Sequence, residues 1–151
     1  MKIALDIDHV IADITNELKR LHPEWCGTKY AIPGLRLSEI DYSIATVLDR
    51  PSFNFECYIT SRPSYAYDVT VQWLAKNRLP NKPVYLAHDK LTQMQKLGIN
   101  VLVDDKLSTF ETILSKSNLH CLLYTQPWNE HVKSIFRINQ LWEVPELLEF
   151  L

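Results

Sequence analysis

The sequence predicts a three-layer α/β/α domain, Rossmann-like in architecture and built on a mostly parallel sheet of five strands. Three observations predict this fold class. Short apolar runs, rich in β-branched and aromatic residues, alternate along the chain with segments of helical periodicity. Their continuous apolar character is typical of strands buried on both faces, as in a parallel sheet. The 151 residues contain no internal repeat, linker or low-complexity tract, which indicates a single domain over 1–151.

Each expected strand is short and is bounded by polar or turn-forming residues. The five strands are expected at residues 2–7, 53–60, 83–87, 101–104 and 121–125. Because helical segments separate them, right-handed β-α-β crossovers should place helices on both faces of the sheet.

The helical segments carry apolar residues that recur every three or four positions. Their stripes are Ile14-Leu18-Leu21, Ile40-Ile44-Val47-Leu48, Ala66-Val69-Trp73, Leu91-Met94-Leu97 and Leu107-Phe110-Leu114. Ser38, with Asp41 three residues later, resembles a capping box and predicts the start of the second helix. Ser64 predicts the start of the third and Gly98 the end of the fourth. A last short helix is expected over 142–151.

Composition excludes several classes of protein. The 16 basic and 18 acidic side chains give a net charge of −2, which disfavours bulk attraction to nucleic acid or anionic lipid. The three glycines are too few for Gly-rich phosphate loops, and the three cysteines lack the spacing of a disulfide framework or zinc ribbon. No segment has the pattern of a signal peptide or a membrane span. A cytoplasmic protein without a membrane partner is expected.

Polar residues whose side chains could take part in catalysis or binding follow four of the expected strands. They are Asp6 and Asp8 after the first, Thr60, Ser61 and Arg62 after the second, Lys90 after the third, and Asp104 and Asp105 at the fourth. Ligands of open α/β sheets bind at the carboxyl ends of the strands. Burying carboxylates together is costly unless a ligand compensates them, so this edge is the predicted functional site.

The residue types suit phosphoryl transfer. Asp6 and Asp104, from neighbouring strands, would offer the hard oxygen ligands that Mg²⁺ prefers, and the metal would let a carboxylate approach a phosphate. Asp6 could then attack phosphorus and form an aspartyl-phosphate, while Asp8 protonates the leaving oxygen and later activates water. The remaining phosphoryl oxygens would be held by Thr60 or Ser61 and by Lys90.

The order of these residues resembles the four motifs of haloacid dehalogenase-like (HAD) phosphatases over nearly the whole chain. The matching residues are Asp6-Ile7-Asp8, Thr60, Lys90 and Asp104-Asp105. The resemblance implies that Asp6 is both nucleophile and metal ligand. It implies that Asp8 is the acid/base and binds the metal through its backbone carbonyl. It also implies that Thr60 and Lys90 bind phosphate, that Asp104 ligates Mg²⁺ directly, and that Asp105 supports a metal-bound water.

Three further segments resemble the 5′(3′)-deoxyribonucleotidase branch of this family. They are LDIDHVIAD at 5–13, Thr60-Ser61-Arg62-Pro63 followed by Thr70 and Trp73-Leu74, and Gln126-Pro127-Trp128-Asn129. A (deoxy)nucleoside monophosphate or a related small phosphate is the substrate that this resemblance implies. Trp128 is expected in the core or at its rim, and Asn129 is expected to cap a following helix.

The sequence departs from the family pattern in two places. His9 follows Asp8 where the family usually has Gly, so either the turn is altered or the side chain faces the substrate. Only 54 positions separate Asp6 from Thr60, which leaves room within 14–52 for no more than a reduced helical cap. Two roles stay open for Arg62, namely clamping the substrate or forming an internal ion pair.

The expected function is that of a Mg²⁺-dependent phosphomonoesterase. A small cap would also admit a bulkier substrate, so a 3′- or 5′-phosphatase acting on nucleic-acid ends is the alternative, although the net charge disfavours it. A response-regulator receiver has its acidic pair on the first strand and its phosphate acceptor on the third, an order that this chain does not have. A silent binding module would require His9 alone to abolish catalysis.

Overall fold

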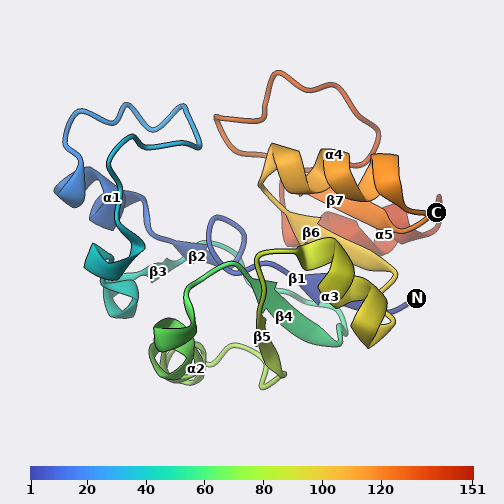
Figure 1. Cartoon of the computed structure of the whole chain (residues 1–151). Helices are drawn as coiled ribbons and strands as arrows, with labels where there is room; N and C mark the ends of the chain where they lie inside the picture. The colour runs from blue at the N-terminus through green and yellow to red at the C-terminus, as the bar shows by residue number, and fades with distance from the viewer.

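The apolar runs form the centre of a parallel sheet in the computed structural model, which describes all 151 residues. The sheet has six strands in the order β5-β4-β1-β6-β7-β8, and every neighbouring pair is parallel (Figure 1). The strands are β1 (Ile3–Leu5), β4 (Cys57–Thr60), β5 (Val84–Leu86), β6 (Val101–Asp104), β7 (His120–Tyr124) and β8 (Arg137–Ile138). The five expected strands are confirmed, and β8 is a sixth that the sequence analysis did not predict.

Helices cover both faces of this sheet, which confirms the three-layer Rossmann-like fold. They are α2 (Tyr67–Lys76), α3 (Lys90–Leu97), α4 (Leu107–Lys116) and α5 (Val144–Leu148). Residues of α2 and α5 share one apolar core with Leu5 and Val103, whereas those of α3 and α4 share another with Ala4 and Leu102. Successive strand residues thus belong to opposite cores, as a pleated sheet requires.

The predicted helix boundaries are largely confirmed. A 3₁₀ turn, Ser64–Ala66, leads directly into α2, and a second, Leu141–Glu143, leads into α5. Helix α3 ends at Gly98, whose φ of 68° is the left-handed conformation that glycine adopts without steric cost. No helix is long and apolar enough to cross a membrane.

The segment after β1 forms a small lid beside the carboxyl ends of the strands (Figure 1). It contains α1 (Thr15–Leu21) and an antiparallel pair, β2 (Ala12–Asp13) with β3 (Thr46–Val47). Its apolar residues form a cluster of their own, which includes Leu18, Trp25 and Tyr42.

The helix predicted from the stripe at residues 40–48 is wrong. This stretch has a 3₁₀ turn, Tyr42–Ile44, that the Asp41 side chain caps by accepting a hydrogen bond from the Ser43 N–H. The chain then pairs as β3 with β2, so its backbone groups are satisfied by a strand rather than by a helix. The apolar stripe does not share one face, because Ile44 is exposed whereas Ile40 is buried.

Candidate active site

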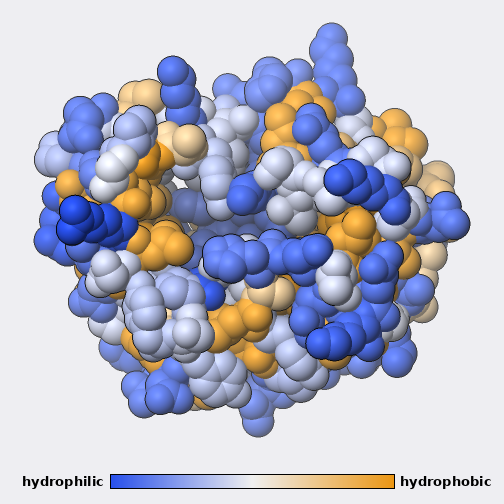
Figure 2. Space-filling model, in the orientation of Figure 1, coloured by the Kyte–Doolittle hydropathy of each residue, from blue (hydrophilic) through white to orange (hydrophobic).

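A cavity of about 390 Å³ lies between the lid and the carboxyl ends of β1, β4 and β6. In Figure 2 it is a hollow with hydrophilic residues at its floor and hydrophobic residues on the lid side. The lid contributes apolar lining residues that include Leu18, Leu35 and Ile40. All the polar residues predicted for the site line this cavity, so the sheet edge brings the set together.

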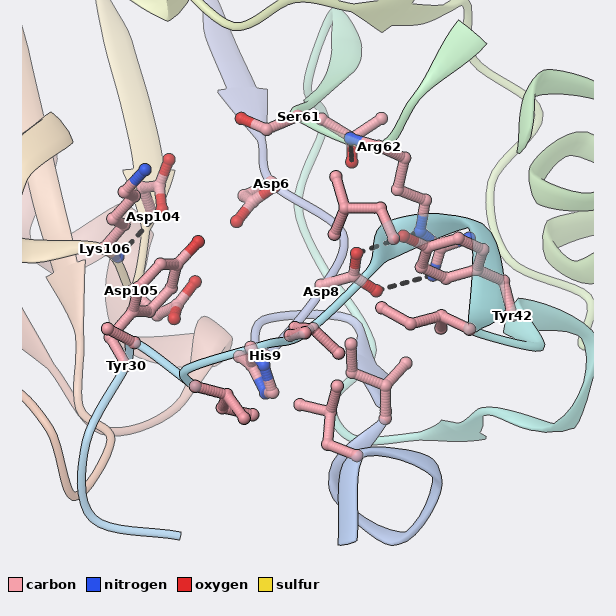
Figure 3. A pocket seen from close by; sticks show the side chains of 18 of the residues that line it. Asp6, Asp8, His9, Tyr30, Tyr42, Ser61, Arg62, Asp104, Asp105 and Lys106 are labelled. Carbon is pink, nitrogen blue, oxygen red and sulfur yellow. Dashed lines mark hydrogen bonds and ion pairs between the residues drawn. The ribbon is translucent and has the colours of Figure 1, made fainter. Parts of the chain in front are cut away.

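Three aspartates meet at the floor of the cavity because β1 and β6 are hydrogen-bonded neighbours. The register pairs Leu5 with Val103, and the Asp6 N–H donates to the Val103 carbonyl at 2.9 Å. This places the side chain of Asp6 beside those of Asp104 and Asp105 (Figure 3). One carboxylate oxygen from each lies within 4.8 Å of the others, and all three residues are buried.

Lys90 supplies the one ammonium group within this acidic cluster. It is the first residue of α3, whose start is capped by Asp89 through the Thr92 N–H. Its Nζ lies 2.8 Å from Asp6 Oδ1 and 2.7 Å from Asp104 Oδ2. The predicted phosphate ligand is therefore paired with two carboxylates, and its buried ammonium lies at the cavity wall.

Burial shifts the pKa values of this cluster. Desolvation, followed by the charge of Asp104, raises the pKa of Asp6 to about 7. Desolvation and the charges of Asp104 and Asp6 raise the pKa of Asp105 well above its ordinary value. Desolvation would lower the pKa of Lys90, but its ion pairs with Asp104 and Asp6 outweigh that effect and raise it.

The donor set fits a hard divalent cation. Three buried carboxylates share one ammonium group, so the cluster carries excess negative charge when all three are ionised. Desolvation first, and this mutual repulsion second, raise the pKa values of Asp6 and Asp105. Carboxylate oxygens are the ligands that Mg²⁺ takes in proteins. Asp6, Asp104 and Asp105 could therefore hold such an ion together. The family resemblance implied direct ligation by Asp6 and Asp104 and a metal-bound water supported by Asp105.

The Asp8 side chain belongs to a different group. Its two oxygens accept from Arg62, at 3.0 Å from Nε and 2.6 Å from Nη2, and it points toward Arg62 and Tyr42 in Figure 3. Arg62 also donates to Thr70 Oγ1 at 2.9 Å and lies 4.2 Å from the centre of the Tyr42 ring. Of the two roles open for Arg62, the structure shows the internal ion pair. The Asp8 carboxylate is not part of the three-aspartate cluster, and its predicted metal contact was through the backbone carbonyl.

Thr60 and Ser61 place two hydroxyl groups at the end of β4. Thr60 is the last residue of the strand, and its Oγ1 accepts from the Arg62 N–H at 3.2 Å. The Ser61 hydroxyl donates to the Ala87 carbonyl, at the end of the neighbouring β5, at 3.3 Å. Both residues line the cavity at the end of the strand next to that of Asp6, where a phosphate could accept from them.

Of the two alternatives for His9, an altered turn or a side chain facing the substrate site, the structure shows the second, with the turn kept. Its φ is 67°, so the backbone keeps the left-handed turn that glycine would adopt freely. The imidazole also lines the cavity and packs edge-on against Trp128, with 4.7 Å between ring centres. Burial lowers the pKa of His9, which favours the neutral imidazole.

Sequence reasoning missed several contacts of the cavity. Lys106 lines it with its Nζ 5.1 Å from the centre of the Tyr30 ring, and its position directly after Asp105 was the available signal. Tyr30, an aromatic residue of the irregular stretch after α1 that was expected in the core or at its rim, also lines the cavity. The prediction that Asn129 caps a following helix is wrong, because no helix begins between it and β8, and its buried amide donates to the carbonyls of Asp105 and Tyr124.

Comparison with models of known protein families found none that matches the chain, and comparison with curated proteins found no match either. The geometry of the cavity and the residue pattern are therefore the grounds for assigning a function.

Proposed function

We propose that the protein is a Mg²⁺-dependent phosphomonoesterase that forms an aspartyl-phosphate on Asp6. The observation that carries this proposal is the convergence of Asp6, Asp104 and Asp105, with carboxylate oxygens within 4.8 Å of one another at the floor of a lidded cavity. The order of these residues along the chain, which resembles that of HAD phosphatases, supports it further.

Asp6 and Asp8 carry the bond-making and proton-transfer steps of this reaction. When bound, Mg²⁺ supplies positive charge that screens the carboxylates from the phosphate. The Asp6 carboxylate attacks phosphorus, and the bond from phosphorus to the leaving oxygen breaks as Asp8 donates a proton to that oxygen. Asp8 then takes a proton from the water that attacks the aspartyl-phosphate, which releases phosphate and restores Asp6.

The other polar side chains stabilise the charge that develops on the phosphoryl group. The Thr60 hydroxyl accepts from the Arg62 N–H and keeps its own proton free to donate to a phosphoryl oxygen, and the Ser61 hydroxyl can turn from the Ala87 carbonyl to do the same, beside the ammonium of Lys90. Arg62 orients Asp8, because its fork holds both carboxylate oxygens of that residue. Asp8 must rotate away from this pair to reach the leaving oxygen, and it lines the cavity.

The shape and lining of the cavity favour a small organic phosphate. Its volume of about 390 Å³ and the apolar lid wall beside a polar floor suit a (deoxy)nucleoside monophosphate, with its phosphate on the aspartates and its base against the lid.

A nucleic-acid end is the second candidate substrate. A neighbouring groove of about 260 Å³ between the starts of α3 and α4 shares His88, Lys90 and Lys106 with the cavity. The hydroxyls of Ser108, Thr109 and Thr112 also line it, so a second phosphate could be accommodated there.

The decisive variant is Asp6→Asn, which keeps the size of the side chain and removes the nucleophile. We expect phosphate release from nucleoside monophosphates to fall by at least about 10³-fold, with an unchanged circular dichroism spectrum. Asp68→Asn, at an exposed position of α2, is the control and should keep full activity. Wild-type turnover by Asp6→Asn, or activity that EDTA does not reduce, would contradict the proposal. Phosphorylated oligonucleotides assayed in parallel distinguish the two substrates.

A further inference from the structure

The loop that follows β7 contacts the cluster of three aspartates through Asp105. Its residue Trp128 is half-buried, and its indole Nε1 donates a hydrogen bond to Asp105 Oδ2 at 3.0 Å. Lys90 pairs with Asp6 and Asp104 but not with Asp105. The indole N–H is therefore the one nitrogen donor that holds the Asp105 carboxylate.

A single donor of this kind has a defined effect on a ligating carboxylate. It fixes the rotation of the side chain and so orients the oxygens that would bind a metal. Without it, no nitrogen donor would hold the Asp105 carboxylate, because Lys90 pairs only with Asp6 and Asp104. The carboxylate could then rotate away from the cluster.

The loop is itself held firmly in place. The buried Asn129 amide donates to the carbonyls of Asp105 and Tyr124, both at 2.8 Å. Gln126 Nε2 donates to the His9 carbonyl at 2.9 Å, beside the turn that follows the nucleophile strand. Trp128 is thus anchored to the backbone on both sides of the aspartate cluster.

The Trp128 ring is also packed among aromatic residues of the lid. Its centre lies 6.3 Å from that of Trp25, 6.2 Å from that of Tyr30 and 4.7 Å from that of the His9 ring. The same side chain therefore contacts the lid with its ring and the metal-binding cluster with its N–H group.

We propose that Trp128 is a positioning residue of the metal site, which holds Asp105 in its ligating orientation through the indole N–H. This inference rests on the proposed metal site, but it does not depend on the identity of the phosphate substrate. Asp105 and Trp128 form one unit, in which the lid aromatics set the position of the indole and the indole sets that of the carboxylate.

The test compares two Trp→Phe variants in the same aromatic cluster. Trp128→Phe keeps a ring and deletes the N–H that reaches Asp105. Trp25→Phe makes the same change, but the N–H it deletes donates to the Lys29 carbonyl at 2.8 Å. Mn²⁺ affinity is measured directly by electron paramagnetic resonance of the free ion. We expect Trp128→Phe to weaken it by about tenfold or more, and Trp25→Phe, which keeps a ring against Trp128 and the N–H to Asp105, to weaken it far less.

A double-mutant cycle with Asp105→Asn completes the experiment. Trp128→Phe should cause no further loss of affinity in the Asp105→Asn background, because the carboxylate it positions is gone. Wild-type affinity in Trp128→Phe, equal losses in both Trp→Phe variants, or additive losses in the double mutant would each overturn the proposal. If only the proposed phosphatase function is wrong, the metal affinities would still change as expected but no phosphate ester would be cleaved. That result is distinguishable from failure of the inference about Trp128.

Discussion

His9 is held in a backbone conformation that costs free energy for every residue except glycine. Its φ of 67° is maintained by a tight turn, in which the His9 N–H donates to the Ala12 carbonyl at 2.7 Å. The imidazole recovers part of this cost through burial and its edge-on contact with Trp128. Strain of this kind persists where a side chain serves a site, and His9 lines the cavity.

Two substitutions at His9 separate the backbone cost from the side-chain contact. His9→Ala and His9→Gly both remove the imidazole, but only glycine also relieves the left-handed strain. We expect His9→Gly to be more stable than His9→Ala by about 1 kcal/mol, measured by urea unfolding. This order is the reverse of that in ordinary helix or strand positions, and a more stable alanine variant would show that the turn is not strained.

Residue identity alone located most of the candidate site but could not assign its pairings. Asp6 and Asp104 could be placed together because adjacent parallel strands end at one edge of the sheet. The pairing of Arg62 with Asp8 could not be predicted, because it depends on rotamers and on contacts with Thr70 and Tyr42 from separate elements. The hydrogen bond from Trp128 to Asp105 is likewise a contact between loops that no spacing reveals.

Among the elements, the apolar runs of the central strands were predictable and the structure of the lid was not. A strand in the centre of a parallel sheet must be apolar on both faces, and this leaves a clear signal. The stripe at 40–48 carries helical spacing by coincidence, since Ile40 packs in the lid cluster while Val47 lies in β3. Strand β8 has two residues, too few for a periodic pattern, and Arg137 within it bonds to Thr125 and Asn129.

The lid should respond to metal although no lid residue is a predicted ligand. Trp25 and Tyr30 pack on Trp128, which bonds Asp105, so fixing Asp105 with Mg²⁺ should stabilise the lid against opening. We expect Mg²⁺ to slow amide hydrogen exchange over residues 23–36, measured by mass spectrometry. The α2 segment, which does not line the cavity, is the internal control. Protection confined to the strand ends would show that lid and metal site are independent.

For the molecule as a whole, the two apolar cores and the acidic cluster have opposite effects on the stability of the folded state. The sheet is buried between two apolar clusters that stabilise the fold, whereas the aspartates are buried with too little positive charge. Their raised pKa values mean that the folded state binds protons more tightly than the unfolded chain. Burying the ionised aspartates therefore lowers the stability of the folded state, and the two apolar cores offset this loss.

This opposition predicts how pH and metal together affect the free energy of unfolding. Because the pKa of Asp6 is raised from 3.8 to about 7, its contribution to stability is fully present below about pH 4 and is lost as the pH rises through about 7. The pKa of Asp105 is also raised, so its contribution to stability is likewise lost as the pH rises. Mg²⁺ requires the ionised carboxylates, so it should stabilise the protein most where they have lost their protons.

At about pH 8, Mg²⁺ at roughly 100 times its dissociation constant should add about 2.7 kcal/mol, or roughly 5–10 °C in melting temperature. The same concentration at about pH 5 should give a much smaller shift, because protons compete for Asp6 and Asp105. Differential scanning fluorimetry with and without EDTA measures both.

Asp105→Asn is the matched control, since it removes one buried charge. Its metal-free form should melt higher than wild type at about pH 8 and should gain little from Mg²⁺. Equal shifts at the two pH values would contradict the assignment of these carboxylates as the metal ligands.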